Sequence, residues 1–498
     1  MPWPLKESHL KRYPHFDAHI PLAELLKLAT DPAAVRRHAF FPFLHYEKRW
    51  RPFRRTAGPP KRKIRPIRYA SRRDSAIFSY YRHLLSAPYE AELTCRGIES
   101  CPIAYRKLRR HDSDRGKCNI DFAADAFQRI RDLGNCCAVT LDVSGFFDNI
   151  DHDTLRSAWS HLLQVQELPA DHRSVFRSIT RYAVVDRNAA YERLGFFGDK
   201  IGPNGRISKG YLKPRRDMPI QLCSPREFRE KICGADAQYS SLITTNMNAY
   251  GIPQGAPISD LLANVYLLGF DQLMGEYSHS RGGAYFRYSD DIFILVPGDE
   301  KAGRDAEAFA TAAIRKSGDQ LEIKASKTSI VTFAQKSGGG LLATRADKPS
   351  YTGGVEYLGF RFDGMRVYIR ESTMSKFHRG IRLAARRRAI QLVRRYPGKA
   401  FDFLLHQFNI SAFEARFGRV AEFERSLAHR KWTFRTYVKR CVEVFGPSGD
   451  NFFGQTRNHK RFLRDAASAA LRTALAKHTV ARNQLNKMDV EPQSPWER

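Results

Sequence analysis

Metal-binding and disulfide patterns of cysteine are absent from this sequence. Its eight cysteines never form a Cys-x-x-Cys pair, and two of them, Cys136 and Cys137, are adjacent. This spacing argues against a zinc finger and provides no disulfide framework. We therefore expect the cysteines to be buried free thiols.

A long uncharged apolar run is also missing, and so is a signal peptide, because the first ten residues already carry Lys6 and Glu7. Without either feature, the sequence predicts a cytoplasmic protein with no membrane partner. The chain has 498 residues, 42% of them hydrophobic, which is enough to bury a large core in more than one domain or subdomain.

Acidic residues are scarce relative to basic ones. The 52 Asp and Glu stand against 83 Lys and Arg, which gives a formal net charge of +31. A chain of this charge is expected to bind a polyanion, and the missing apolar run makes nucleic acid a better partner than a membrane surface.

Two adjacent carboxylates, Asp290 and Asp291, lie between an aromatic run and an apolar run in the stretch 285–296. Because side chains alternate faces along a strand, this pattern predicts a β-hairpin that holds the acids at its tip. Neighbouring carboxylates repel each other, and the usual relief is protonation or a divalent metal ion bound by oxygen ligands. Taken alone, the stretch is equally typical of a water-exposed Asp-Asp turn.

Two other stretches place polar groups at the ends of predicted elements. An apolar strand that starts near Cys137 ends at Asp142, and Gly145 allows a sharp turn after it. Such an Asp can also be a simple cap or turn residue. The Gly- and Pro-punctuated loop 251–260 opens onto a helical run, and Gln254 is its amide available to a ligand.

The remaining chain divides by composition. Residues 1–50 are predicted to form an ordinary helical extension. Residues 51–73 alternate basic and apolar side chains, which indicates a strand or hairpin with a cationic face for phosphates, or a solvated sheet edge. Residues 186–248 form a basic, Gly-rich insertion that we assign only to nucleic-acid or partner contact. Beyond 371 the chain is basic and helical, which favours contact with a phosphate backbone.

In their order and local context, these motifs resemble the palm of reverse transcriptases. The resemblance covers about residues 50–365. It is carried by Leu-Asp-Val-Ser-Gly-Phe-Phe-Asp-Asn-Ile-Asp-His from 141, Gly-Ile-Pro-Gln-Gly-Ala-Pro-Ile-Ser-Asp-Leu-Leu-Ala-Asn-Val-Tyr-Leu from 251, Arg-Tyr-Ser-Asp-Asp from 287, Ser-Lys-Thr from 326 and Tyr-Leu-Gly-Phe from 357.

The resemblance implies an α+β right-hand polymerase fold with fingers, palm and thumb, in which the palm sheet is antiparallel and the C-terminal region helical. Residues 1–50 would be the N-terminal extension and 51–365 the fingers and palm, interrupted by the insertion at 186–248. Residues 366–498 would be a basic helical thumb.

The resemblance also implies a catalytic centre. Asp142 and Asp290 would ligate two Mg²⁺ ions, with Mn²⁺ as the alternative ion. Asp291 would add charge beside them, and the main-chain carbonyl of Val143 would be a further ligand. Lys327 matches a lysine that could donate a proton to the leaving pyrophosphate.

Other positions match substrate-binding residues of the family. Phe147 falls at the steric gate that excludes a ribose 2′-hydroxyl, although it could instead pack in the core, a role that Phe146 can serve. The remaining matches are Lys61 or Lys63 with Arg65 as the grip on the triphosphate, Gln254 and Gly255 as the lining of the nucleotide and template pocket, and Tyr357, Leu358, Gly359 and Phe360 as the primer grip.

These roles imply an RNA-directed DNA polymerase that uses an RNA template, a DNA primer or product, and dNTPs. The insertion, the Ala-Tyr-Arg at 104–106 and the long C-terminal region are most similar to bacterial abortive-infection and antiphage-defence reverse transcriptases, which suggests copying of an associated non-coding RNA. The alternatives are a group II intron-like or retron enzyme, template-independent or protein-primed synthesis, and a maturase-type RNA-binding scaffold. Oligomerisation stays open.

Overall fold

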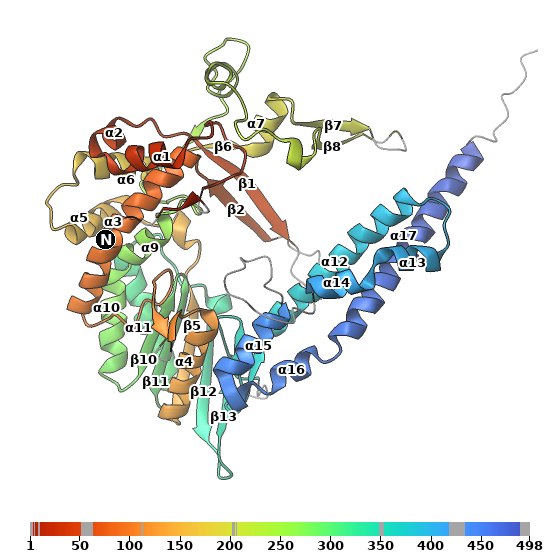
Figure 1. Cartoon of the computed structure of the whole chain (residues 1–498). Helices are drawn as coiled ribbons and strands as arrows, with labels where there is room; N and C mark the ends of the chain where they lie inside the picture. Colours follow the sequence, from red (N-terminus) through yellow and green to blue (C-terminus); the bar gives the residue numbers. More distant parts are fainter. Residues whose placement is uncertain are drawn as a thin grey trace, which may run out of the picture. The chain divides into compact units, whose positions relative to one another are not determined.

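A computed structural model of the chain describes residues 3, 5–7, 10–50, 63–110, 113–201, 205, 207–347, 353–417 and 434–488 (Figure 1). The chain mixes helices and strands, so the α+β class is confirmed. It divides into two compact units that differ from the predicted domains. Unit 1 contains Met1–Leu108 and Cys136–Ile330, and unit 2 contains Arg109–Asn135 and Val331–Arg498.

In unit 1, three neighbouring strands of one sheet pair antiparallel, in the order β10 (Ala284–Tyr288), β11 (Asp291–Pro297), β5 (Cys136–Asp142). The residues of β11 from Ile292 to Val296 are almost completely buried. Such a strand must be covered on both faces, which explains its continuous apolar run. In β11, the polar residue Asp291 therefore stands at the start of the strand.

Helices α10 (Leu268–His279) and α11 (Glu300–Ser317) pack against this sheet. The close approach of α11 depends on small residues. A side chain on Gly303 would collide with the Cys137 sulfur, and the helix buries three alanines on the same face. Close packing at this position holds β5 in place.

A second sheet of unit 1 has the order β2-β1-β6-β9, and β1 and β2 form the antiparallel pair that carries Arg65. The prediction of a helical segment over residues 1–50 is wrong at its end, because residues 43–50 are strand β1. Antiparallel pairing with β2, not a helical period, decides this segment. The bounds are α1 (Leu22–Thr30), α2 (Pro32–Arg37), β1 (Phe43–Trp50), β2 (Lys63–Tyr69), β6 (Ala183–Asp186) and β9 (Thr244–Thr245).

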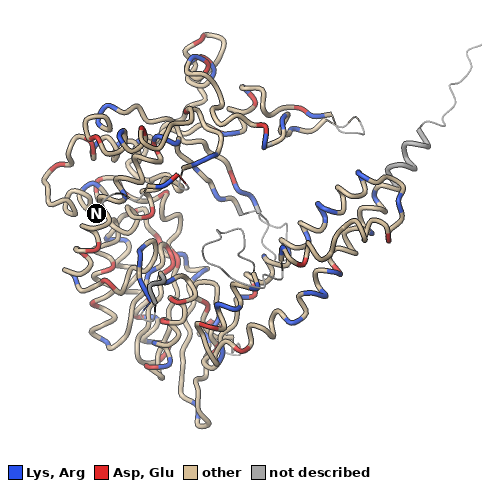
Figure 2. Tube along the Cα trace, viewed as in Figure 1, with Lys and Arg blue, Asp and Glu red and all other residues tan. Residues whose placement is uncertain are grey.

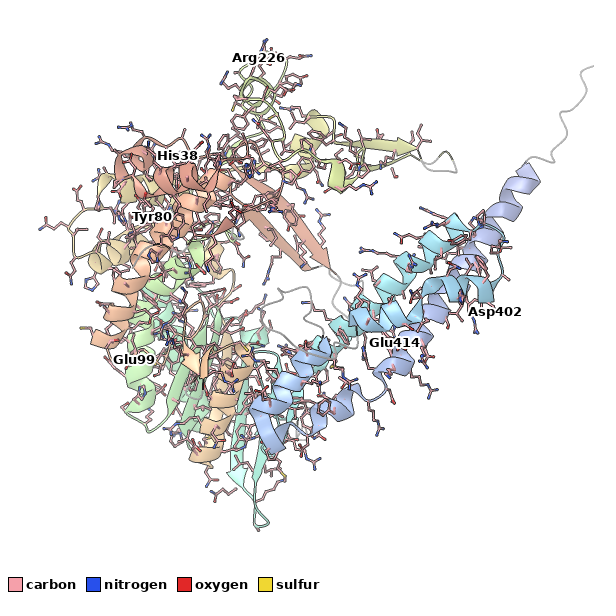
Figure 3. The ribbon with its side chains drawn as sticks, viewed as in Figure 1. His38, Tyr80, Glu99, Arg226, Asp402 and Glu414 are labelled. Atoms are coloured by element: carbon pink, nitrogen blue, oxygen red, sulfur yellow. The ribbon has the colours of Figure 1, made fainter. Side chains whose placement is uncertain are left out.

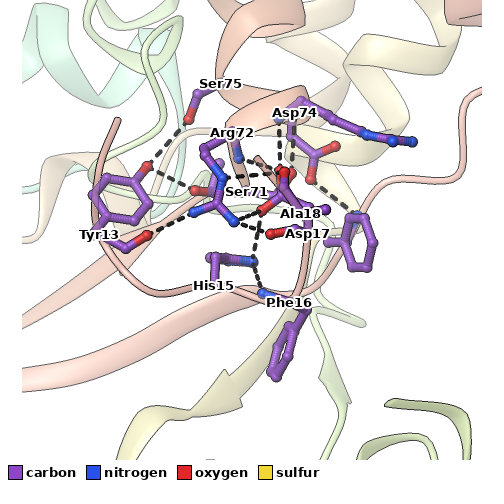
Figure 4. Close-up of polar contacts among 12 residues, drawn as sticks. Tyr13, His15, Phe16, Asp17, Ala18, Ser71, Arg72, Asp74 and Ser75 are labelled. Carbon is purple, nitrogen blue, oxygen red and sulfur yellow. Dashed lines mark hydrogen bonds and ion pairs between the residues drawn. The ribbon is translucent and has the colours of Figure 1, made fainter. Parts of the chain in front are cut away.

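The N-terminal segment stabilises the junction between β2 and α3 (Arg72–Cys95) through hydrogen bonds and an ion pair, as Figure 4 shows. The Asp17 carboxylate accepts from the backbone N–H of Arg72 at 2.9 Å and of Arg73 at 3.1 Å. It also pairs with the Arg72 guanidinium at 3.0 Å, and that guanidinium donates to the Tyr13 carbonyl at 2.7 Å. Since α3 follows β2 directly, this buried cluster determines where the Arg65-bearing strand ends.

The insertion is more regular than its glycine content predicted. It contains a helix, a two-stranded hairpin and a short helix that continues into a π-helical turn at Phe228–Ile232, packed around a buried apolar cluster. The remaining elements of unit 1 are α5 (His152–Leu162), α6 (Ala170–Thr180), α7 (Arg187–Arg193), β7 (Phe197–Ile201), β8 (Ile207–Tyr211), α8 (Pro225–Glu227) and α9 (Ser259–Tyr266).

Unit 2 has two parts. In one part, Phe127 of α4 stacks on Phe362, and Phe360 packs against Phe445 and Phe452. The other part is a helical bundle in which α12 and α17 pack along each other, as the basic helical C-terminal prediction requires. The bounds are β3 (Arg109–Arg110), β4 (Ser113–Gly116), α4 (Asn119–Leu133), β12 (Ser329–Gln335, begun in unit 1), β13 (Leu341–Arg345), β14 (Val355–Tyr357), β15 (Phe360–Phe362), β16 (Val367–Ile369), α12 (Glu371–Arg395), α13 (Phe401–Phe408), α14 (Ile410–Phe417), α15 (Phe434–Phe445), α16 (Asn451–Thr456) and α17 (His459–Met488).

All eight cysteines are free thiols, as expected, but only five are buried, because Cys95 is exposed and Cys118 and Cys233 are partly exposed. Within the described helices, none has a long enough apolar stretch to cross a membrane.

Candidate two-carboxylate site

The predicted hairpin is present, and its turn consists of Ser289 and Asp290. Tyr288 pairs with Asp291, so Asp291 is the first residue of β11 and Asp290 lies in the turn itself. Ser289 has a left-handed backbone, with a φ of 62°. A non-glycine residue in this conformation is held there by its surroundings at some energetic cost, and such strain is often found at functional sites.

Arg287 holds this turn from inside the protein. Its side chain is completely buried, and its Nε donates to Asp271 Oδ1 at 2.6 Å. Its Nη1 donates to the carbonyl of Ser289 at 3.2 Å and to the side chain of Asn264 at 3.1 Å. Burial alone would lower the pKa of Arg287, but the Asp271 carboxylate outweighs burial and raises it, so the guanidinium stays charged.

Residues 103–105, which precede β3, belong to the same hydrogen-bond network. Asn264 donates to the Ala104 carbonyl at 2.9 Å, and the backbone N–H of Ile103 donates to the Arg287 carbonyl at 3.0 Å. The hydroxyl of Tyr105 donates to Ser289 Oγ at 3.3 Å. The sequence motifs include Tyr105, Asn264 and Arg287 but assign none of them a role at the site.

Asp142 lies at the end of β5, directly opposite Asp291 in the strand pairing. The strand end is held on both sides. The N–H of Val143 donates to the Asp290 carbonyl at 3.1 Å, and the N–H of Lys324 donates to the Asp142 carbonyl at 3.0 Å. The backbone pairing therefore places the end of β5, with Asp142, beside the turn that carries Asp290 and Asp291.

Cations balance these carboxylates. The Lys327 ammonium forms an ion pair with Asp142, whose side chain is only 14% exposed. Burial raises the pKa of Asp290 above its usual range, and so does the neighbouring Asp142 carboxylate, whereas Lys327 and Arg65 act in the opposite direction. Asp290 therefore lies within electrostatic reach of Asp142, Lys327 and Arg65.

The donor atoms fit a hard divalent cation. Asp142, Asp290 and Asp291 supply carboxylate oxygens, the ligands that Mg²⁺ prefers, and Lys327 already occupies a cationic position beside Asp142. In the described part of the chain, no three His, Cys, Asp or Glu side chains are gathered closely enough to form a complete metal centre by themselves. A main-chain ligand such as the Val143 carbonyl would have to complete the set.

The predicted nucleotide-binding residues also lie in unit 1. After the left-handed Gly145, Phe146 is 3% exposed whereas Phe147 is only half-buried. Phe146 thus serves the core, and part of the Phe147 ring remains accessible. The N–H of Ile252 donates to the Phe147 carbonyl at 2.8 Å, which joins this turn to the Gln254 loop.

The Gln254 loop is packed directly on strand β2. The N–H of Arg68 donates to the Gln254 carbonyl at 3.3 Å, and a side chain on Gly255 would collide with the Arg68 carbonyl. Arg65 is exposed on the same strand, and Figure 2 shows the basic residues along β1 and β2. Lys61 and the side chain of Lys63 lie outside the described residues.

The predicted primer grip belongs to unit 2. Leu358 and Gly359 form the turn between β14 and β15, both with left-handed backbones. Tyr357 is 3% exposed and Phe360 is 0% exposed, because both rings belong to the unit's core. Only the turn itself could therefore contact a ligand at this position.

No family model and no curated protein matches this chain. Among solved structures, apo telomerase from Candida tropicalis aligns with 88% of this chain and 64% of its own, at 10% identity and a TM-score of 0.37. Telomerase from Candida albicans in complex with a TWJ fragment of telomeric RNA aligns with 89% of this chain and 65% of its own chain. Its identity is also 10% and its TM-score is also 0.37. The chain thus spans less than two thirds of the length of these proteins. Scores this low do not establish a shared fold.

Removing Arg287 should destabilise the protein strongly. Arg287→Met leaves Asp271 buried without its charged partner, which should lower the free energy of unfolding by about 3–5 kcal/mol. The double variant Arg287→Met with Asp271→Leu removes both charges and should recover part of this loss. Denaturant titration of the wild type, both single variants and the double variant gives the coupling energy. Strictly additive losses would contradict the assigned pairing.

Proposed function

We propose that this protein is an RNA-directed DNA polymerase that adds dNTPs at the site formed by Asp142 and Asp290. The observation that carries the proposal is the placement of Asp290 in a strained turn against the end of β5, with Lys327 and Arg65 near enough to affect its charge. Partly buried carboxylates placed close to each other are an unfavourable arrangement unless cations are bound.

Two divalent ions would be held by Asp142 and Asp290, with Asp291 and the Val143 carbonyl as further oxygen ligands. When bound, Mg²⁺ or Mn²⁺ would stabilise the charge on the attacking and leaving oxygens of nucleotidyl transfer. The ordered strand ends keep the carboxylates in place before a ligand arrives, so little reorganisation is required.

The remaining residues would position the substrates. Arg65, exposed on β2, would bind the triphosphate with its planar guanidinium, together with Lys63. Lys327 would be repelled from Asp142 by a bound cation, and its ammonium could then donate a proton to the leaving pyrophosphate. The backbone at Gln254 and Gly255, packed on β2, would line the nucleotide pocket.

The units would correspond to the parts of a right-hand polymerase. The β10-β11-β5 sheet would be the palm and the β1-β2 pair part of the fingers. The α12 bundle would be a thumb that holds duplex by its phosphates through exposed arginines such as Arg382, Arg386 and Arg387. The partners would be an RNA template and a DNA primer or product.

The biological role that we propose is antiphage defence, in which the enzyme copies an associated non-coding RNA. The support is the likeness of the motif order, the insertion and the C-terminal region to defence-associated reverse transcriptases. Sequencing the RNA and DNA that co-purify with the protein, with and without phage infection of expressing cells, tests this role. Recovery of one enriched RNA with complementary DNA is expected, and unspecific RNA without DNA would contradict it.

Asp290→Asn should abolish DNA synthesis. Primer extension on an RNA template with dNTPs should lose at least about 100-fold in rate, because the isosteric amide removes the charge that balances the cations. Asp153→Asn is the matched control, since its carboxylate is 80% exposed on α5.

The outcomes of this assay separate the alternatives. Equal rates for wild type and Asp290→Asn would refute catalysis at this site, and RNA binding without any synthesis would point to a maturase-type scaffold. Synthesis without template, or DNA covalently attached to a Ser, Thr or Tyr, would identify a template-independent or protein-primed polymerase.

Phe147→Ala should weaken the discrimination against ribonucleotides. Without the ring, a 2′-hydroxyl meets no obstacle, so the dNTP-to-NTP ratio of kcat/KM should fall by roughly tenfold or more. Phe146→Ala is the control, because that buried ring should affect stability by about 3–5 kcal/mol and leave the ratio unchanged. An unchanged ratio in Phe147→Ala would remove the steric-gate assignment.

A further inference from the structure

Hairpin β7–β8 of the insertion is not used by the proposed site. Figure 1 shows it extending outward from α7, and Figure 3 shows its side chains standing clear of the neighbouring elements of unit 1. Between 199 and 213, every described residue except Gly210 is exposed. A segment of this kind contributes little burial of its own, so its outer half is available to a ligand.

The base of the hairpin is firmly anchored. Phe197 and Tyr211 face each other across the strands with ring centroids 5.6 Å apart, and Tyr211 also contacts the buried Tyr191. The N–H of Leu212 donates to the Phe196 carbonyl at 2.9 Å. These contacts join the hairpin to the apolar cluster of the insertion, so its outer end is held by a defined base.

The outer end carries an exposed apolar pair. Ile201 is 79% exposed and Ile207 is 64% exposed, and the two residues are direct partners in the strand register. Because paired residues of antiparallel strands point to the same face, their side chains form one apolar surface. Neither isoleucine contributes to a core, so packing within the described chain does not explain why β-branched apolar residues stand there.

Positive charge surrounds this apolar pair. Lys200, Lys209, Lys213 and Arg216 are exposed on the hairpin and its C-terminal continuation, against Asp199 and Asp217, and the Lys209 ammonium is paired with Glu192 of α7. Lys200 lies on the face opposite the isoleucines, where Gly198 pairs with Gly210 and the side chains of Leu212 and Lys200 lie over the two glycines. Lys200 is exposed and is placed to contact a sugar-phosphate backbone.

We propose that hairpin β7–β8 binds duplex nucleic acid, with Ile201 and Ile207 packed against an opened base step and the lysines on the phosphates. Isoleucine is one of the apolar side chains that proteins insert between base steps, and the surrounding cations supply the sequence-independent attraction. Lysines on the strands also disfavour pairing of the hairpin with another β-strand, which makes a protein partner the weaker alternative. The inference rests on the proposed function only in taking nucleic acid as the substrate.

The packing of Ile201 and Ile207 against an opened base step is tested by a binding assay without nucleotides. The probe is an RNA–DNA duplex with a single-stranded template end and 2-aminopurine at the terminal base step, read by anisotropy and by 2-aminopurine fluorescence. The wild type should unstack the probe and raise its fluorescence. Ile201→Ser with Ile207→Ser should abolish this rise and weaken binding by about tenfold, without changing the salt dependence. Leu342→Ser, which changes a 41% exposed leucine on another hairpin, is the control.

The proposed contacts between the hairpin lysines and the phosphates are tested by salt titration of the same probe. Lys200→Ala with Lys213→Ala should reduce the slope of log K against log salt by about one for each residue, whereas Lys301→Ala at the start of α11 should affect it less. Unchanged binding and fluorescence in the isoleucine variant would overturn the proposal, and so would a loss of self-association in that variant with unchanged binding. Because no dNTP is present, failure of polymerase activity would leave these results interpretable.

Discussion

The buried ion pair between Arg287 and Asp271 is the interaction on which the rest of the site depends. A fully desolvated guanidinium is tolerated only when its donors are satisfied, and here they are used by Asp271, by Asn264 and by the carbonyl of Ser289. Those acceptors belong to two helices and to the turn itself. The left-handed backbone of Ser289 is therefore held by groups that have no other low-energy arrangement, and the carboxylate of Asp290 is positioned as a consequence.

This arrangement explains the charge distribution around the turn. The backbone contacts of Val143 bring Asp142 to Asp290, and their mutual repulsion is opposed by Lys327 and by the more distant Arg65. Keeping these anionic oxygens close together thus lowers the stability of the folded protein. A rigid core beneath the turn, with cations around it, is the arrangement expected where charge must be stabilised without reorganisation. The Gln254 loop is also packed rigidly on strand β2, because Gly255 lies so close to that strand that only glycine fits.

Much of the backbone that forms the site could be predicted from local sequence patterns. The alternation around Asp290 predicts the hairpin, and the apolar run before Asp142 predicts β5. Tyr105 and Asp271 could not be predicted, because their contacts with the turn join residues far apart in the chain and leave no periodic signal. The strand at 43–50 was missed because its partner β2 lies beyond a separating segment. The insertion appeared irregular because its glycines interrupt the strand pattern while still allowing the hairpin.

Asp142 and Asp290 would act as one cation-binding unit, and Mn²⁺ binding tests this proposal most directly. Titration followed by electron paramagnetic resonance measures free Mn²⁺ without requiring template, primer or activity. The wild type should bind Mn²⁺ in competition with Mg²⁺, and Asp142→Asn and Asp290→Asn should each weaken binding by at least about tenfold, or 1.4 kcal/mol. Equal Mn²⁺ affinity in the wild type and both variants would contradict the account.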